Sequence, residues 1–432
     1  MKYSRYNLRT REGSKLIVYN TLTGALVVID QSVSQVERSM NSTNPAFLIP
    51  QDLIEPFRDH GIMIDDDYDE RAIVHLRNMS GRTQNELILS IMLTLQCNFR
   101  CRYCFQERSG QVLTDEVERR IMRWLEKRVP KLDRLSVDWY GGEPLIERSK
   151  LLRLNSWIGN LCHEWETDYI VTLTTNGFLL DAEMIAYLKN YQVGHLQITL
   201  DGPADCHDFS RPLANGEETF AKVFGNICRA REAGIPISIR VNAWRPNIER
   251  IPEIYAILEA AGLKNEVHVI AKPVLTSEAN PSADLCLDTP EASERIMEMY
   301  LEAADSGWIV LPYADTLQGH EFCIVDSLGQ FIVGPDGNIY KCGERFSKEE
   351  RVGQLSGEGE LILDETEWSG WVAKNPLSFP ECSGCKYLPI CMGGCSMKRK
   401  WKPEESPCVE IKYAEGNFLR VLVRNEQNKK GG

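Results

Sequence analysis

The residues with the clearest chemical potential are three closely spaced cysteines, Cys97, Cys101 and Cys104. Three thiolates at CxxxCxxC spacing can hold three irons of a cubane cluster, because iron–sulfur clusters take cysteine ligands from short turns. Three protein ligands leave the fourth iron open to another molecule. A partial zinc site or a trio of buried cysteines is the alternative, but structural zinc requires a fourth ligand nearby.

Glycine-containing polar turns follow three further apolar runs, at 141–144, 174–177 and 199–203. Glycine lets a ligand approach the backbone closely, and the Glu143 carboxylate can accept hydrogen bonds from a cation. Alone, each of these segments is more often only a turn. The carboxyl ends of strands form the active face of a (β/α) barrel. Together with the cysteine trio, the turns therefore predict one site at that face.

A second group of cysteines lies near the C-terminus, where x2, x5 and x3 gaps separate four of them. A zinc module of the treble-clef or ribbon type is the alternative, but these gaps fit poorly with its paired CxxC knuckles. The group consists of Cys323, Cys342, Cys382, Cys385, Cys391, Cys395 and Cys408. The other four, Cys162, Cys206, Cys228 and Cys286, match no ligand spacing.

Alternating strand and helix patterns supply the elements that must position these residues. Apolar, β-branched runs lie at Leu87–Leu95, Leu135–Tyr140, Tyr169–Thr174, Leu196–Leu200, Ile235–Val241 and Val267–Ile270. Helical candidates between them include Thr114–Val129, Asp181–Asn190, Glu218–Ala233 and Ile251–Ala261. Six strand–helix units in series predict a parallel sheet, open or curled into part of a barrel.

The first 85 residues have a different pattern. Runs at Lys15–Tyr19 and Ala25–Ile29 predict a strand–turn–strand unit. Helical candidates follow at Gln31–Met40 and Pro50–His60, and the acidic run Asp65–Glu70 is expected to close this α+β module as a solvated boundary. The chain thus divides into predicted domains at 1–85, 86–310 and 311–432, the last of them loop-rich.

Composition excludes several classes of partner. The chain has 432 residues, 43% of them hydrophobic, which is enough for two or three domains. Its formal charge of −13 disfavours binding to nucleic acids and to anionic lipid surfaces. Without a membrane-spanning run or a secretory signal, a cytoplasmic location is expected. In that reducing compartment, 14 cysteines favour metal ligands or catalytic thiols over disulfides.

From about Leu87 to Pro273, the chain resembles radical S-adenosylmethionine (SAM) enzymes, through its CxxxCxxC loop and its GGEP turn. The resemblance implies a partial (β/α)6 TIM-like barrel, with a 4Fe–4S cluster on Cys97, Cys101 and Cys104 whose open iron binds SAM. It also implies that SAM is lined by Tyr103, Gly142, Glu143, Thr199 and Arg211. Thr199 replaces the serine of a related SLDG pattern but keeps the hydroxyl.

The seven C-terminal cysteines are similar to the SPASM extension of that family, which binds two auxiliary 4Fe–4S clusters. Three clusters in all are thereby implied. The second auxiliary cluster would use Cys382, Cys385, Cys391 and Cys408, and the first would use Cys323, Cys342 and Cys395. Only three thiolates serve the first, because Cys286 lies far upstream and His320 and Glu321 are unusual ligands. We therefore expect an open or exchangeable iron there.

The N-terminal module resembles, more weakly, the winged-helix elements of maturases that act on ribosomally synthesised and post-translationally modified peptides (RiPPs). Such elements bind the leader of a precursor peptide as an added strand. A structural cap on the barrel is the alternative.

Together these resemblances imply an oxygen-sensitive RiPP maturase, supplied by an external low-potential electron donor. SAM would be cleaved to methionine and a 5′-deoxyadenosyl radical, which takes hydrogen from a peptide carbon. An oxidative cross-link follows, with a thioether between cysteine sulfur and carbon as the first choice. Another cross-link, such as a carbon–carbon bond, is an alternative product.

Two other functions are alternatives to a RiPP maturase. Anaerobic sulfatase maturases make formylglycine and carry an aspartate directly after the equivalent of Cys342, whereas this chain has Gly343 and then Glu344. A non-catalytic iron–sulfur electron carrier would not need the GGEP turn or the other polar strand ends.

Overall fold

The computed structural model describes residues 1–42, 48–83, 85–106, 109–191, 193–275, 282–312, 323–402 and 405–431. Two compact units are formed, each from segments distant in the sequence. The first comprises Met1–Arg82, Thr289–Cys323 and Lys374–Gly432, and the second comprises Thr83–Asp288 and Ile324–Ala373. Within the described ranges, every helix is too short or too polar to cross a bilayer. The division at 1–85, 86–310 and 311–432 stays a prediction.

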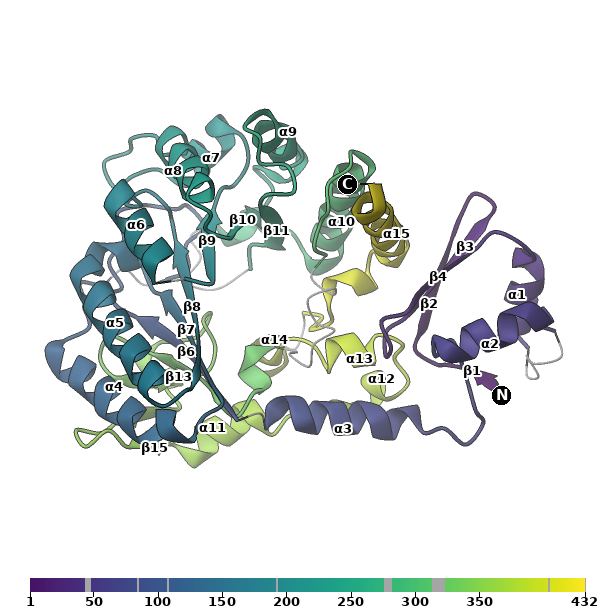
Figure 1. Ribbon diagram of the computed structural model, residues 1–432, viewed down its shortest axis with the longest axis horizontal. Helices are drawn as coiled ribbons and strands as arrows, with labels where there is room; N and C mark the ends of the chain where they lie inside the picture. Colours follow the sequence, from purple (N-terminus) through teal and green to yellow (C-terminus); the bar gives the residue numbers. More distant parts are fainter. Residues whose placement is uncertain are drawn as a thin grey trace. The chain divides into compact units, whose positions relative to one another are not determined.

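A ten-stranded sheet is the centre of the second unit, in the order β11-β10-β9-β8-β7-β6-β12-β13-β14-β15 (Figure 1). Six of its strands form one parallel series: β6 (Glu86–Met92), β7 (Arg134–Tyr140), β8 (Asp168–Thr175), β9 (His195–Thr199), β10 (Ile237–Ala243) and β11 (His268–Pro273). Each lies beside the strand that precedes it in the chain, which is barrel order. The predicted partial (β/α)6 barrel is confirmed.

Helices connect these strands, and Figure 1 shows α4, α5 and α6 along the outer side of the sheet. They are α4 (Asp115–Arg128), α5 (Arg148–Glu164), α6 (Ala182–Asn190), α7 (Ala204–Ser210), α8 (Phe220–Glu232) and α9 (Glu253–Ala260). On β7, buried Leu135, Val137 and Trp139 alternate with the less buried Asp138 and Tyr140. Because strand side chains alternate between faces, Asp138 and Tyr140 lie on the inner face of the barrel.

Residues after the barrel extend the same sheet. Strand β12 (Gln330–Val333) pairs in parallel with β6, with Gln330 opposite Ile88. It is followed by antiparallel β13 (Asn338–Tyr340), β14 (Gly353–Leu355) and β15 (Leu361–Leu363), and then by α11 (Glu365–Val372). Part of the region that the sequence predicted to be loop-rich is therefore sheet.

The first unit contains the predicted α+β module. Its antiparallel sheet joins β2 (Asn7–Glu12), β3 (Lys15–Asn20) and β4 (Leu26–Ile29). Beside the sheet lie α1 (Val33–Met40), α2 (Gln51–Asp59) and the short pair β1 (Lys2–Tyr3) and β5 (Met63–Ile64). Strands β3 and β4 match the predicted strand–turn–strand unit, and Leu16, Val36 and Phe57 share its buried core.

Later segments complete the first unit. They include α3 (Glu70–Arg82), α10 (Thr289–Asp305), α12 (Pro380–Ser383), α13 (Leu388–Cys391), α14 (Ser396–Trp401) and α15 (Glu415–Gly431). Helix α15 packs on the N-terminal sheet, where the rings of Tyr19 and Phe418 lie 5.7 Å apart. Its Arg424 also pairs with Glu12 at 2.6 Å. The two ends of the chain thus share one core.

The pairing of β12 with β6 gives the first prediction. A Cβ on Gly329 would lie 2.3 Å from the backbone oxygen of Glu86. Gly329→Ala should therefore force the strands apart and lower the free energy of unfolding by about 1–3 kcal/mol. The matched control is Gly357→Ala, where a Cβ would meet nothing within 4 Å. Equal melting temperatures of the two variants in circular dichroism would contradict the pairing.

Candidate active site

The carboxyl ends of β6, β7 and β8 are joined by direct hydrogen bonds. Gly142 N donates to Thr94 O at 2.9 Å, and Glu143 N donates to Gln96 O at 2.8 Å. From the end of β8, Asn176 Nδ2 donates to Asn98 Oδ1 at 2.8 Å. The structure thus brings together the cysteine loop and two of the three polar turns that the sequence singled out.

Two glycines make this approach possible. Gly141 has φ of +124°, in the range that favours glycine. A Cβ on Gly142 would lie 2.2 Å from Gln96 O, a backbone atom of the segment that leads into Cys97. No side chain fits between the two backbones, so the GGEP turn needs glycine at both positions.

Glu143 is fully buried, and its carboxylate receives three donors. Oε1 accepts from Leu145 N at 3.0 Å and from Thr175 Oγ1 at 2.7 Å, and Oε2 accepts from Asn176 N at 2.8 Å. Burial raises the pKa of this carboxyl, while the three hydrogen bonds oppose the rise. Glu143 therefore ties the end of β7 to the end of β8, a contact that the sequence did not predict.

Cys97, Cys101 and Cys104 lie close enough for their charges to interact. Cys97 Sγ accepts from Phe99 N at 3.4 Å and from Asn176 Nδ2 at 3.9 Å. Burial raises the pKa of the Cys97 thiol, and it raises the pKa of Cys101 to about 12. As thiolates, these three residues need a compensating positive charge, which bound iron supplies.

Arg211 provides an independent sign that an anionic group binds here. Its guanidinium lowers the pKa of both Cys97 and Cys101. Its Nε–H is buried and donates to no partner in the described part of the chain. A buried donor without an acceptor costs free energy. The donor set therefore fits an iron–sulfur cluster with an anionic ligand.

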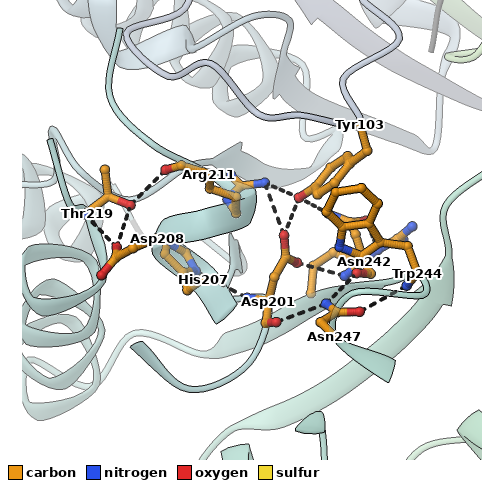
Figure 2. A network of polar contacts seen from close by, with 10 residues as sticks. Tyr103, Asp201, His207, Asp208, Arg211, Thr219, Asn242, Trp244 and Asn247 are labelled. Atoms are coloured by element: carbon orange, nitrogen blue, oxygen red, sulfur yellow. Dashed lines mark hydrogen bonds and ion pairs between the residues drawn. The ribbon is translucent and has the colours of Figure 1, made fainter. Parts of the chain in front are cut away.

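The other predicted SAM-lining residues lie at the same edge of the sheet. Thr199 ends β9 on the inner face of the barrel, alternating with buried Ile198. Tyr103 and Arg211 are buried and joined to each other, because Arg211 NH1 donates to Tyr103 Oη at 2.7 Å (Figure 2). Their contact with SAM stays a prediction, as do those of Gly142, Glu143 and Thr199.

Four charged or phenolic groups within the second unit were not predicted. Burial raises the pKa of Asp138 to about 6 and that of Glu344 to about 7, with Arg240 opposing the latter. Burial also raises the pKa of the Tyr140 hydroxyl. This tyrosine interacts electrostatically with Asp138, Glu344 and Arg240, and also with Cys104. Gln106 Nε2 donates to its hydroxyl at 3.1 Å. The positions of Asp138 and Tyr140 on β7 and of Arg240 on β10 could have indicated this polar inner face. Glu344 lies in the turn after β13, where no strand pattern marks it.

Part of the C-terminal cysteine group also comes together. The charges of Cys382, Cys385 and Cys408 all act on Cys391, and burial raises its pKa to about 11. Lys412 Nζ lies 3.2 Å from Cys408 Sγ. These four cysteines are the predicted ligands of the second auxiliary cluster. In the described ranges, no three His, Cys, Asp or Glu side chains form a group suited to one metal ion.

The first auxiliary set is divided between the units, with Cys323 and Cys395 in the first and Cys342 in the second. The candidate ligands His320 and Glu321 lie outside the described residues. Cys286 packs in a cluster with Tyr103, Trp244 and Val274. All ten cysteine ligands therefore remain predictions.

Comparison with known proteins gives one family match and two informative relatives. Residues 91–268 match the family model of the radical SAM superfamily. The chain is 20% identical to a radical SAM cyclopropyl synthase of Paramaledivibacter caminithermalis, over 79% of this chain and 74% of that protein. It is 24% identical to a cysteine-type anaerobic sulfatase-maturating enzyme of Clostridium perfringens, over 73% of this chain and 90% of that protein.

Two solved structures share the fold. The structure of anSMEcpe with bound AdoMet and Kp18Cys peptide has a TM-score of 0.63 and 20% identity, covering 78% of this chain and 99% of that one. Streptococcus suis SuiB bound to precursor peptide SuiA has a TM-score of 0.52 and 14% identity, covering 95% of this chain and 99% of that one.

The convergence of three thiols at the barrel edge gives the second prediction. Replacing Cys97, Cys101 and Cys104 together by Ala should lower iron and sulfide by about a third after anaerobic reconstitution, since one of three clusters is lost. The matched control replaces Cys162, Cys206 and Cys228 by Ala and should keep all the iron. Loss of all iron from the first variant, or zinc in place of iron in the native protein, would contradict the assignment.

Proposed function

This chain is a radical SAM enzyme that uses S-adenosylmethionine, related to RiPP maturases and sulfatase maturases, and from that premise we propose its reaction. Its substrate is a ribosomally made precursor peptide with a leader, and its product is an oxidative cross-link, with a cysteine thioether as the first choice. The reaction takes place in the cytoplasm, with an external low-potential electron donor.

The chemistry divides between cofactor and protein. When bound, a reduced cluster and SAM would supply a 5′-deoxyadenosyl radical able to remove hydrogen from an unactivated carbon. Cys97, Cys101 and Cys104 would hold the cluster, and Glu143 fixes the adjoining strand ends. Joining a thiol to a carbon removes two hydrogens in total, so an electron acceptor is also required. Two auxiliary clusters on the C-terminal cysteines would meet that need.

The outer edge of β4, which pairs only with β3 among the described strands, is the observation that carries the peptide assignment. Strand β4 pairs with β3, and Asn20 N donates to Ala25 O at 2.9 Å. Because antiparallel hydrogen-bonded pairs alternate, Val27 bonds to β3, while the backbone groups of Leu26 and Val28 point outward. Val28 is also 41% exposed. An extended leader can add to this edge as a further strand.

Two solved structures with bound peptides support the proposal that the substrate is a peptide. SuiB was solved in complex with its precursor peptide SuiA, and the match to that structure extends over 95% of this chain. The match to anSMEcpe leaves about a fifth of this chain without a counterpart, since it covers 78%. A leader-binding module would account for that additional length.

Formylglycine synthesis is the second candidate, favoured by the match to the sulfatase-maturating enzyme. The residue after Cys342 is Gly343, not the aspartate that the resemblance to those maturases requires. The next carboxylate, Glu344, has a pKa raised to about 7 by burial. The absent aspartate and the outer edge of β4 favour cross-linking.

The leader-binding edge gives the third prediction. Val28→Pro removes one outward N–H while leaving the ladder to β3 intact, since proline is tolerated on an edge strand. The dissociation constant for the leader should rise about five- to tenfold, the effect of one lost backbone hydrogen bond. SAM cleavage without peptide should be unchanged.

Val28→Thr is the matched control, because it keeps the N–H and the branched shape and should bind the leader like the native enzyme. Binding by fluorescence anisotropy would measure all three proteins. If Val28→Pro bound the leader as tightly as Val28→Thr, strand addition at β4 would be wrong. Deleting the module is a poorer test, because β2 and β3 share a core with α15.

The packing of Cys286 gives the fourth prediction. This thiol lies against Tyr103 and Trp244, so Cys286→Ala should keep all three clusters. Cys323→Ala, the matched change in the predicted first auxiliary set, should lose one cluster. If the Cys286 variant lost the first auxiliary cluster, Cys286 would close that site, and the expected open iron for a substrate thiolate would be excluded.

A further inference from the structure

A buried polar network lies behind the cysteine loop, with the Tyr103 hydroxyl at its centre (Figure 2). Tyr103 stands between Cys101 and Cys104 in the sequence. Its hydroxyl donates to Asp201 Oδ2 and accepts from Arg211 NH1 at 2.7 Å and from Asn242 Nδ2 at 3.0 Å. One phenol oxygen thus joins the loop to the end of β9, to α7 and to β10.

Asp201 is itself held on every side. It lies two residues after the end of β9 and is fully buried. Oδ1 accepts from Asn242 N at 2.8 Å, and the Asp201 backbone oxygen accepts from Asn247 Nδ2 at 2.9 Å. The Asp201 backbone N–H donates to His207 Nδ1 at 3.2 Å. A buried carboxylate persists only when it is paired and hydrogen-bonded, so its position is closely fixed.

The pairing with Arg211 is indirect. Arg211 NH1 lies 4.0 Å from Asp201 Oδ2, and Tyr103 Oη bonds to both groups. The phenol therefore completes the interaction between the two charges. Removing that single oxygen would leave Arg211 and Asp201 without their shared partner, in a place where water does not reach.

The aromatic ring of Tyr103 is fixed as well. It meets Trp244 edge-to-face, with ring centroids 5.5 Å apart and planes at 76°. The loop backbone adds two contacts, since Arg100 N donates to Pro212 O at 2.8 Å and Arg102 N donates to Ser210 O at 3.0 Å. Two of the three cysteines therefore lie on a turn whose central side chain has little freedom to move.

We propose that Asp201 is a positioning residue for the radical reaction. Through the Tyr103 hydroxyl it fixes the turn that carries Cys101 and Cys104, and so orients the open iron toward bound SAM. This inference rests on the proposed ligation of a cluster by these cysteines. It does not depend on the peptide, because the ligation and the network lie within the second unit.

A purely structural network would have a different consequence. It would lower stability when broken, but correctly folded protein would bind SAM normally. A positioning network changes how SAM meets the cluster even in the folded fraction. The affinity for SAM and the electron paramagnetic resonance (EPR) spectrum of the reduced cluster with SAM distinguish the two, because both report on that contact.

The test compares Tyr103→Phe, Asp201→Asn and the double variant in the full-length, anaerobically reconstituted enzyme. Iron and sulfide should equal the native content. Each single variant should weaken SAM binding about tenfold in anaerobic calorimetry, the effect of losing a hydrogen bond to a charged group. Their SAM-bound EPR spectra should differ from the native spectrum. The double variant should be no weaker than the weaker single variant, because both changes break one interaction.

Tyr187→Phe is the matched control, since this tyrosine on α6 loses hydrogen bonds to Ser156 and Leu152 outside the network. It should bind SAM with native affinity.

If Asp201→Asn does not fold, the result for Tyr103→Phe decides alone, because that change removes only one oxygen atom. Native affinity and spectrum in Tyr103→Phe would overturn the proposal. Loss of iron from Tyr103→Phe would also overturn it, by showing that the network is required to retain the cluster and not only to orient it. No peptide is present, so failure of the cross-linking proposal would leave these results unaffected.

Discussion

The site depends on one close contact, the approach of the Gly141–Gly142 turn to the backbone that leads into Cys97. The ideal Cβ position of Gly142 lies 2.2 Å from Gln96 O, so any side chain there would separate the ends of β6 and β7. That contact places Glu143 where Thr175 and Asn176 can donate to it. Asn176 in turn reaches Asn98 and Cys97. Three strand ends are thereby fixed around one loop.

The same loop is also held by a second interaction, between buried charged groups. Asp201 and Arg211 are both buried, and such groups are costly to bury unless each is satisfied. Their shared partner is a side chain of the cysteine loop, so the interaction that satisfies them also fixes the loop. The close glycine contact and the buried charged groups together fix the position of the cysteine loop. The peptide-binding edge proposed for β4 belongs to the first unit, where binding needs only exposed backbone groups.

The strand–helix alternation from β6 to β11 could be predicted, because each element shows its own hydrophobic period and each strand is bounded by turn residues. The cysteine spacing and the GGEP turn could be recognised for the same reason, since they are local in sequence. Strands β12 to β15 could not, because runs of three or four residues carry no measurable period. The acidic run Asp65–Glu70 is predicted to be solvated, and residues 65–69 are exposed as expected. Glu70 is instead buried, and it accepts hydrogen bonds from Ser4 and Arg5.

The polar contacts of the site could not be predicted from the sequence either, because they join residues that are far apart along the chain. The partners Tyr103 and Asp201 are 98 positions apart, and no local pattern marks Asp201 as different from any aspartate in a turn. Nothing local in the sequence marks Asp138, within a predicted strand, or Glu344, two residues after Cys342, as a buried carboxyl group. The distance of Cys286 along the chain argues against it as a cluster ligand, and the structure places it in a buried hydrophobic cluster with Tyr103.

The central proposal is that the radical chemistry of this enzyme forms an oxidative cross-link in a peptide. The most direct measurement incubates the reduced enzyme with SAM and a cysteine-containing precursor, then counts 5′-deoxyadenosine against the mass of the peptide. Oxidative cross-linking predicts one 5′-deoxyadenosine for each pair of hydrogens lost, together with a thiol that no longer reacts with alkylating reagents. A peptide of unchanged mass beside accumulating 5′-deoxyadenosine, or one whose cysteine has become an aldehyde, would contradict the account.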